Sequence, residues 1–164
     1  MIESHDYQVQ LNGTGPKTGI LDSIEDGLPS LGVASPPQFG GPGRVWSPEH
    51  LFVASAAACL MTTFQAIAAM SNLDLVDYGD DATGHLIRGE DRRYRIERVT
   101  LRPRVVVGDP DDVEKAQGLL EKAKTLCLIS RSMSCDIDME PTVEAAASVS
   151  AGRELLEGAH TVLI

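Results

Sequence analysis

The sequence is poor in the residues that build metal sites and disulfide frameworks. It holds three cysteines and four histidines in 164 residues. No Cys-x-x-Cys pair is present and no histidine has ligand-like spacing to a cysteine, so we expect no zinc site. An odd number of cysteines without an N-terminal apolar signal region argues against a secreted disulfide framework. We therefore expect free thiols, a cytoplasmic location, and neither a metal nor a cofactor.

Positive charge is also scarce. The chain has 14 lysines and arginines against 24 acidic residues, a formal net charge of −10. This balance argues against a nucleic-acid partner, because phosphate binding needs clustered cations. The arginines between residues 88 and 104 alternate with apolar residues, which is typical of a strand with one solvated face. No apolar run reaches membrane-spanning length, so we expect no membrane partner.

What the chain does have is the composition of a globular protein, with 43% hydrophobic and 23% charged residues. Its length suffices for one domain with a core and is too short for two ordinary ones. We expect a single domain over residues 1–143. An alanine-rich tail follows over residues 144–164, and the sequence does not indicate its role.

The order of patterns predicts a mixed α+β domain. Alternating apolar residues cut by glycine turns predict short strands from Tyr7 to about Leu31, followed by a proline- and glycine-rich loop. Period-two patterning returns from Leu75 to Val107, with one extra residue near Glu97 that indicates a bulge. A final strand is predicted in "SCDIDMEPTV".

A long helix is predicted from Ser47 to Met70. Ser47 is a good N-cap, Pro48 suits the first helical position, and Glu49 in the first turn suits the helix dipole. Alanines leave little bulk along this helix, and apolar residues occur around much of its circumference. We therefore expect it to be buried, in part against a second subunit. Cys59 stands near its middle.

A second helix is predicted from Asp109 to about Cys127, with an apolar stripe at spacings of three and four that ends on Cys127. Buried cysteines are more often inert core residues than reagents. The two cysteines are 68 residues apart (127 − 59). Their types and positions alone do not show whether they meet, so a core role and a reactive role both stay open.

Three stretches carry a resemblance to a known family. "SPEHLFVASAAACL" resembles the cysteine-bearing central helix of the OsmC/Ohr family of thiol-dependent peroxide reductases. "FGGPGRVW" is similar to the glycine-rich loop before that helix, and "EKAKTLCLISRSMS" to the segment with the family's second cysteine. The resemblance covers about residues 11–143. It implies an α+β fold in which two antiparallel-rich sheets wrap around long central helices in an intertwined homodimer.

The resemblance also implies roles for five residues. Cys59 matches the thiolate that attacks the peroxide, Cys127 the thiol that resolves it to a disulfide, and Glu49 the carboxylate at the helix start. The family lowers the pKa of its reactive thiol with an arginine. Lys17, in "GPKTG", stands where one branch carries that arginine, and Arg44 lies near the position used by the other. The family usually has Cys-Pro at the second cysteine, whereas Leu128 follows Cys127 here.

The implied function is a peroxidase that reduces organic hydroperoxides in oxidative-stress defence, using a dithiol reductant. Two alternatives stay open: a binding or redox-sensing member of the fold with little turnover, and a structural dimer with inert cysteines. Lys17 and Gln38, which stand where the two branches of the family carry their arginine, favour the sensing alternative. On one straight helix Glu49 and Cys59 would lie about 15 Å apart. An active site containing both therefore predicts a contribution from each of two subunits.

Overall fold

The computed structural model describes residues 4–24 and 27–146 of the chain. The chain forms two compact units, Met1–Phe52 and Val53–Ile164. That both units belong to the single domain expected from the length stays a prediction. The expected C-terminal tail begins inside the last strand, and apart from its first three residues it lies outside the described part.

The first unit contains the predicted group of short strands. Strands β1 (Val9–Gly15), β2 (Thr18–Ser23) and β3 (Leu31–Ala34) form an antiparallel sheet in sequence order. The glycine turn between β1 and β2 places Lys17 in the left-handed backbone region, with φ of 62°. The second predicted turn includes residues 25–26, which lie outside the described part.

The glycine-rich loop after β3 is held by its own backbone. It contains a short 3₁₀-helix, η1 (Pro37–Phe39), and its end returns to the sheet where the N–H of Ala34 donates to the carbonyl of Trp46 at 2.9 Å. Gly41 has no room for a side chain, because a Cβ there would lie 1.5 Å from the carbonyl oxygen of Ser35. The glycine is therefore required by a close backbone approach.

Helix α1 (Pro48–Met70) begins where the sequence predicts. Ser47 is buried, and its Oγ accepts from the N–H of His50 at 3.3 Å. In return the N–H of Ser47 donates to Nδ1 of His50 at 3.3 Å. This reciprocal pair is a capping box with histidine in the position usually held by glutamate or glutamine. It satisfies two backbone donors at the helix start.

One face of α1 packs into the core of the second unit. The ring of Phe64 lies against that of Tyr78, with 5.7 Å between centroids. The helix is long and apolar enough to cross a membrane by length and composition, a test that the core helix of a soluble protein also passes. The sequence analysis expected no apolar run of membrane-spanning length, and this was wrong for α1. Its alanines keep the mean hydropathy high even though polar residues stand between them. The buried positions recur every fourth residue: Ala56, Leu60, Phe64 and Ala68.

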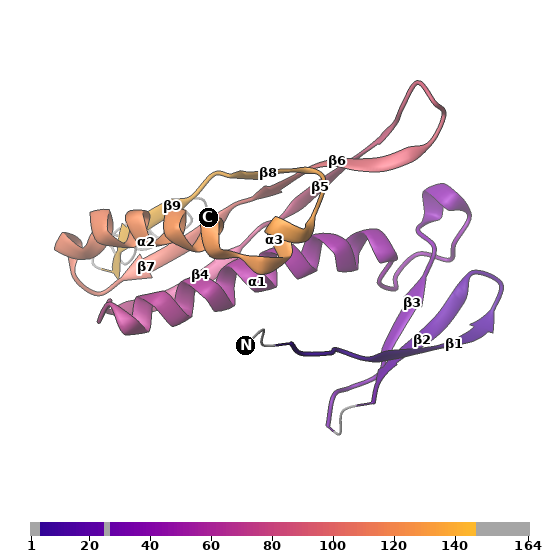
Figure 1. Cartoon of the computed structure of the whole chain (residues 1–164), viewed down its shortest axis with the longest axis horizontal. Coiled ribbons are helices and arrows are strands. Elements are labelled where there is room, and N and C mark those ends of the chain that lie inside the picture. Colours follow the sequence, from indigo (N-terminus) through magenta and orange to yellow (C-terminus); the bar gives the residue numbers. More distant parts are fainter. Residues whose placement is uncertain (1–3, 25–26, 147–164) are drawn as a thin grey trace, which may run out of the picture. The chain divides into compact units, whose positions relative to one another are not determined.

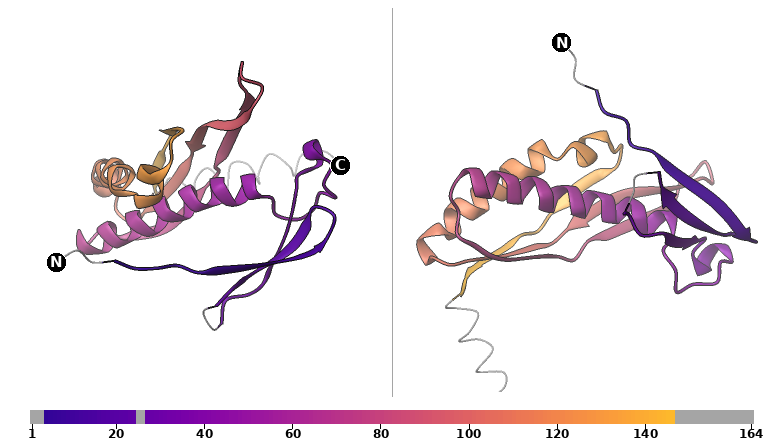
Figure 2. Two further views of the ribbon diagram at one scale, coloured as in Figure 1. Left: turned by 45° about the vertical axis from the view of Figure 1, so that its right-hand side comes forward. Right: turned by 90° about the horizontal axis from the view of Figure 1, so that it is seen from below.

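The second unit is built on long strands that are each interrupted once (Figures 1 and 2). They form two three-stranded sheets, β4-β7-β9 and β5-β6-β8, each with one antiparallel and one parallel pair. Glu97 is the extra residue in β6 between the partners of His85 and Leu86, which confirms the predicted bulge. The strands are β4 (Leu75–Asp80), β5 (Thr83–Arg88), β6 (Tyr94–Leu101), β7 (Pro103–Val107), β8 (Asp136–Met139) and β9 (Thr142–Ala145).

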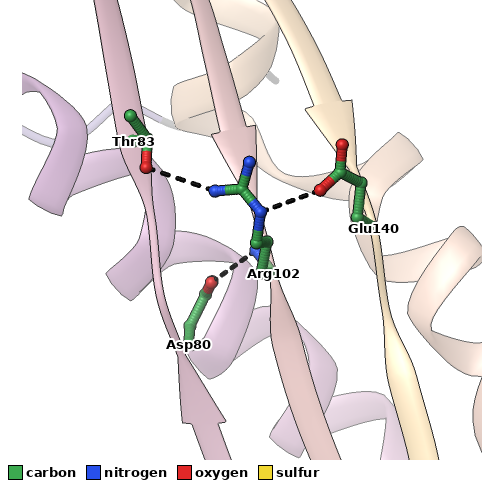
Figure 3. Close-up of polar contacts among 4 residues, drawn as sticks. All are labelled: Asp80, Thr83, Arg102 and Glu140. Carbon is green, nitrogen blue, oxygen red and sulfur yellow. Dashed lines mark hydrogen bonds and ion pairs between the residues drawn. The ribbon is translucent and has the colours of Figure 1, made fainter.

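Arg102 joins the strands at their interruptions (Figure 3). It lies between β6 and β7, and its N–H donates to Oδ1 of Asp80, the last residue of β4, at 2.8 Å. Its Nε donates to Oε2 of Glu140 at 2.8 Å and its Nη1 to Oγ1 of Thr83 at 3.2 Å. The side chains of Arg102, Glu140 and Thr83 are exposed, so the contacts among them contribute little free energy. Their effect is to fix the direction in which the strands continue.

The strands of the second unit carry charged side chains on one face and buried apolar side chains on the other. Arg98 and Arg104 form ion pairs with acidic residues of neighbouring strands on the solvated side, which confirms the predicted arginine pattern. Val99, Leu101 and Val105 are fully buried on the other side. Strand β7 leads through a 3₁₀-turn, η2 (Pro110–Asp112), into α2 (Val113–Leu126), which contacts β7 and β9. The buried residues of α2 follow the predicted stripe: Ala116, Leu120 and Ala123.

Candidate functional site

Two thiols from different helices meet inside the second unit. Cys59 lies near the middle of α1, next to the buried stripe, and is partly exposed. Cys127 lies at the junction of α2 with a short helix, α3 (Leu128–Ser132), and is fully buried. The two thiols influence each other's ionisation: Cys127 lowers the pKa of Cys59, and Cys59 raises the pKa of Cys127. Both cysteines are reduced and unpaired.

The backbone fixes Cys127 from both sides. Its N–H donates to the carbonyl of Ala123 at 2.8 Å, which closes the last turn of α2. Its own carbonyl accepts from the N–H of Arg131 at 3.1 Å, within α3. Its side chain accepts a hydrogen bond from Oγ of Ser130, with 3.1 Å between oxygen and sulfur. The sulfur therefore has little freedom to leave its position beside Cys59.

The surroundings of Cys59 favour its thiolate. Burial is the largest single effect and raises the pKa of Cys59, but four hydrogen bonds oppose it. The net result is a pKa below the ordinary value for cysteine. The four donors are the amide of Ile129, the thiol of Cys127, the hydroxyl of Thr63 and the amide of Leu128.

Cys127 is the protonated member of the pair. Burial raises the pKa of Cys127, the Ser130 hydroxyl opposes that effect, and the neighbouring Cys59 raises it further. Tyr78 on β4 belongs to the same region, since the charge of Cys127 adds to the effect of burial in raising the pKa of that phenol. The hydroxyl of Tyr78 is buried without a hydrogen-bond partner among the described residues. The arrangement thus holds one thiolate and one thiol side by side.

No cation is among the groups that shift the pKa of Cys59 within the described part of its unit. The candidate cations Lys17 and Arg44 both belong to the first unit. Nζ of Lys17 donates to the carbonyl of Phe39, so this lysine holds the glycine-rich loop. Arg44 lines an open pocket of about 430 Å³ together with Val45, Trp46 and His50.

The remaining candidate residues are a glutamate, Glu49, and the third cysteine, Cys135. Glu49 lies in the first turn of α1, and its Oε2 is buried without a hydrogen-bond partner among the described residues. Cys135 precedes β8, is partly exposed, and has a pKa raised mainly by burial. Across residues 4–24 and 27–146, no cluster of three or more histidine, cysteine or acidic side chains could hold a metal ion.

Sequence reasoning missed the groups that surround the two sulfurs. Two of the donors to Cys59 are backbone amides of Leu128 and Ile129, and any residue type except proline carries such a group. Helix α3 has only five residues, too few to show a helical period. Ser130 was visible three residues after Cys127. Residues three apart at a helix start are neighbours, so this spacing could have indicated a contact between Ser130 and Cys127.

The sequence matches one family model and one curated relative. A family model described as OsmC-like protein matches residues 41–142. The uncharacterized protein YmaD of Bacillus subtilis (strain 168) is 26% identical over 156 residues, which are 93% of this chain and 100% of that protein.

Solved structures agree with this match. An OsmC-like protein of unknown function from Vibrio cholerae has a TM-score of 0.76 at 19% identity, over 84% of this chain and 99% of that one. An organic hydroperoxide resistance protein OsmC from Legionella pneumophila has a TM-score of 0.67 at 24% identity, over 86% and 99%. These likenesses confirm the expected α+β fold, while its homodimeric assembly stays a prediction.

Proposed function

Because the chain belongs to the family of OsmC-like proteins, we propose that it is a thiol-dependent peroxidase that reduces organic hydroperoxides. Cys59 is the attacking thiolate and Cys127 the resolving thiol. The observation that carries the proposal is a pair of neighbouring thiols from different helices whose pKa values are shifted in opposite directions, down at Cys59 and up at Cys127. A pair of inert core cysteines would not need amide donors aimed at one sulfur.

The reaction has three steps. The Cys59 thiolate attacks the terminal oxygen of the hydroperoxide, the O–O bond breaks, and the alkoxide leaves to be protonated to an alcohol. Cys59 is then a sulfenic acid. Cys127 attacks that sulfur, the S–O bond breaks, and the disulfide and water form. A dithiol reductant restores both thiols by exchange through a mixed disulfide.

The opposite pKa shifts of the two thiols set the order of these steps. While Cys59 is a thiolate, the pKa of Cys127 is raised by burial and by the neighbouring Cys59, so the resolving thiol stays protonated. Oxidation removes the negative charge from Cys59 and with it that contribution. Cys127 therefore becomes easier to ionise only after the peroxide has been reduced.

The proposal also includes a charged pair beside the thiols and a homodimer. Glu49 offers a buried carboxylate oxygen that would accept a hydrogen bond from a cation, and Lys17 and Arg44 are the candidates. A homodimer would cover the exposed small-residue face of α1, where Ala58 and Ala66 allow close approach of a second helix. We propose a cytoplasmic homodimer with no cofactor, membrane or nucleic-acid partner.

A thiol count during reaction with cumene hydroperoxide tests the proposal. We expect two thiols lost per peroxide reduced in a single turnover, and repeated turnover with dithiothreitol as reductant. Cys127→Ser should stop turnover and leave Cys59 trapped as a sulfenic acid that reacts with dimedone. Cys135→Ser is the matched control and should keep full activity.

The same measurement separates the alternatives. A redox-sensing protein would also lose two thiols, but its oxidation by peroxide would be slow, so that it would show little turnover with dithiothreitol. A structural protein with inert cysteines would lose none. Loss of activity in Cys135→Ser equal to that in Cys59→Ser would contradict the assignment of the pair.

A further inference from the structure

We propose that Ser130 is a positioning residue for the resolving step, in which its hydroxyl holds the sulfur of Cys127 and donates to it as it becomes a thiolate. The inference rests on the proposed function, and it assigns a role to a residue that neither the family motif nor the two cysteines require.

The geometry places a donor on the resolving sulfur. Oγ of Ser130 lies 3.1 Å from Sγ of Cys127 and donates to it. Cys127 in turn lowers the pKa of Cys59, its neighbour on α1. Ser130 follows Cys127 by three residues, so the first turn of α3 sets this contact. A serine hydroxyl on a fully buried sulfur is not exchanged for water, which makes the bond stronger than one at the surface.

The resolving step needs such a donor. Cys127 must attack as a thiolate, yet burial opposes its ionisation. The titratable groups that face it are Cys59 from α1 and Tyr78 from β4, with Asp80 beside Tyr78. In the reduced pair Cys59 also raises the pKa of Cys127, and after oxidation of Cys59 burial remains as the effect that opposes ionisation of Cys127. Ser130, through its hydroxyl and its amide, is the residue that lowers the pKa of Cys127.

The step balances without another reagent. Cys127 loses its proton, its sulfur attacks the sulfur of the Cys59 sulfenic acid, and the S–S bond forms as the S–O bond breaks. The hydroxide that leaves takes up the proton and departs as water. Cys127 sulfur is oxidised and Cys59 sulfur is reduced. The hydroxyl of Ser130 keeps its own proton and donates throughout.

Closure of the disulfide can be timed directly. All variants carry Cys135→Ser, so that only two thiols report. Reduced protein is mixed with one equivalent of cumene hydroperoxide, and the disulfide and the dimedone-trapped sulfenic acid are quantified by mass spectrometry over a range of pH. Ser130→Ala removes the donor, and Ser130→Thr keeps a hydroxyl. Ser132→Ala is the matched control, because its hydroxyl lies on the same helix but donates to the carbonyl of Leu128.

We expect Ser130→Ala to close the disulfide about tenfold more slowly and to move the pH inflection of closure up by about one unit. Formation of the sulfenic acid should be unchanged, so more of it is trapped by dimedone. Ser130→Thr and Ser132→Ala should behave as the parent. A Ser130→Ala variant with the parental rate and inflection would overturn the proposal. So would an equal loss in Ser132→Ala or in Ser130→Thr.

A second oxidant separates this inference from the proposed function. Diamide adds to the Cys59 thiolate, and Cys127 then displaces the adduct to form the same disulfide with no peroxide involved. If peroxide fails to oxidise the parent but closure by diamide still slows in Ser130→Ala, the peroxidase proposal fails and the role of Ser130 stands. If diamide closes both proteins equally fast, the role of Ser130 is refuted whatever peroxide does.

Discussion

Replacement of Leu128 by proline should raise the pKa of Cys59. Proline has no N–H, so Leu128→Pro deletes one of the two amide donors on the Cys59 sulfur and leaves that of Ile129. A hydrogen bond to a charged group contributes about 1.5–3 kcal/mol, and one pKa unit corresponds to about 1.4 kcal/mol. The amide of Leu128 is the weakest of the four donors, so we take the lower limit and expect a rise of about one unit.

The local structure accepts this substitution. Leu128 is the first residue of α3, the helical position that proline favours. Cys127 before it has φ of −58° and ψ of 109°, an extended conformation compatible with a following proline. The side chain of Leu128 is 65% exposed, so its loss removes little packing. The change also restores the Cys-Pro pair that the family usually has at its second cysteine.

The assay is the rate of alkylation of Cys59 by iodoacetamide as a function of pH, followed on the Cys59 peptide by mass spectrometry. Leu128→Ala is the matched control, because it removes the same side chain and keeps the N–H. We expect the profile of Leu128→Pro to move to higher pH and that of Leu128→Ala to coincide with the parent. Coincident profiles for the two variants would refute the role of the amide, and equal shifts would assign the effect to the leucine side chain.

Two further predictions follow from other parts of the chain. Gly41→Ala should destabilise the protein by about 1–3 kcal/mol in urea unfolding, because the new Cβ overlaps the carbonyl of Ser35, whereas Gly118→Ala, with open space around its Cβ, should not. If two subunits share the active site, Glu49→Gln and Cys59→Ser, each inactive alone, should recover partial activity when refolded together. Verified mixed dimers without recovered activity would restrict each site to one chain.

The elements that could be predicted are those whose signals are local. Ser47 and Pro48 marked the start of α1, and the parity change around Glu97 marked the bulge in β6. Both signals depend on side-chain type and spacing, which the sequence states directly. The buried stripe of α2 ended on Cys127 for the same reason, so its place at the helix end could also be predicted.

What surrounds the two sulfurs could not be predicted in this way. The meeting of Cys59 with Cys127 was available only through resemblance to a family, because 68 residues separate them (127 − 59) and no local rule spans that distance. The amide donors of Leu128 and Ile129 were not expected, while a role for Lys17 or Arg44 stays a prediction. Backbone donors appear only when the chain path is known. The buried hydroxyl of Tyr78 could not be predicted either. Nothing in the sequence around Tyr78 indicates that Cys127 influences its pKa.

The parallel pairing of β8 with β6 has a consequence for the order in which the chain folds. Parallel strands require a crossover, and here the whole segment from η2 to α3 lies between β7 and β8. Contacts between distant residues form late, since the loop must close before they stabilise anything. The antiparallel β5–β6 hairpin can therefore form while the crossover is still open.

In the proposed mechanism, that crossover carries both the amide donors that lower the pKa of Cys59 and the thiol that resolves its sulfenic acid. Before it closes, Cys59 has no amide donors from α3 and reacts as an ordinary, slow thiol. Once it closes, Cys127 arrives in the same movement as Leu128 and Ile129. A nascent or locally opened chain thus never presents an activated thiolate without its partner. If the proposed mechanism holds, one short segment supplies both the reactivity of Cys59 toward peroxide and the thiol that protects Cys59 from irreversible oxidation.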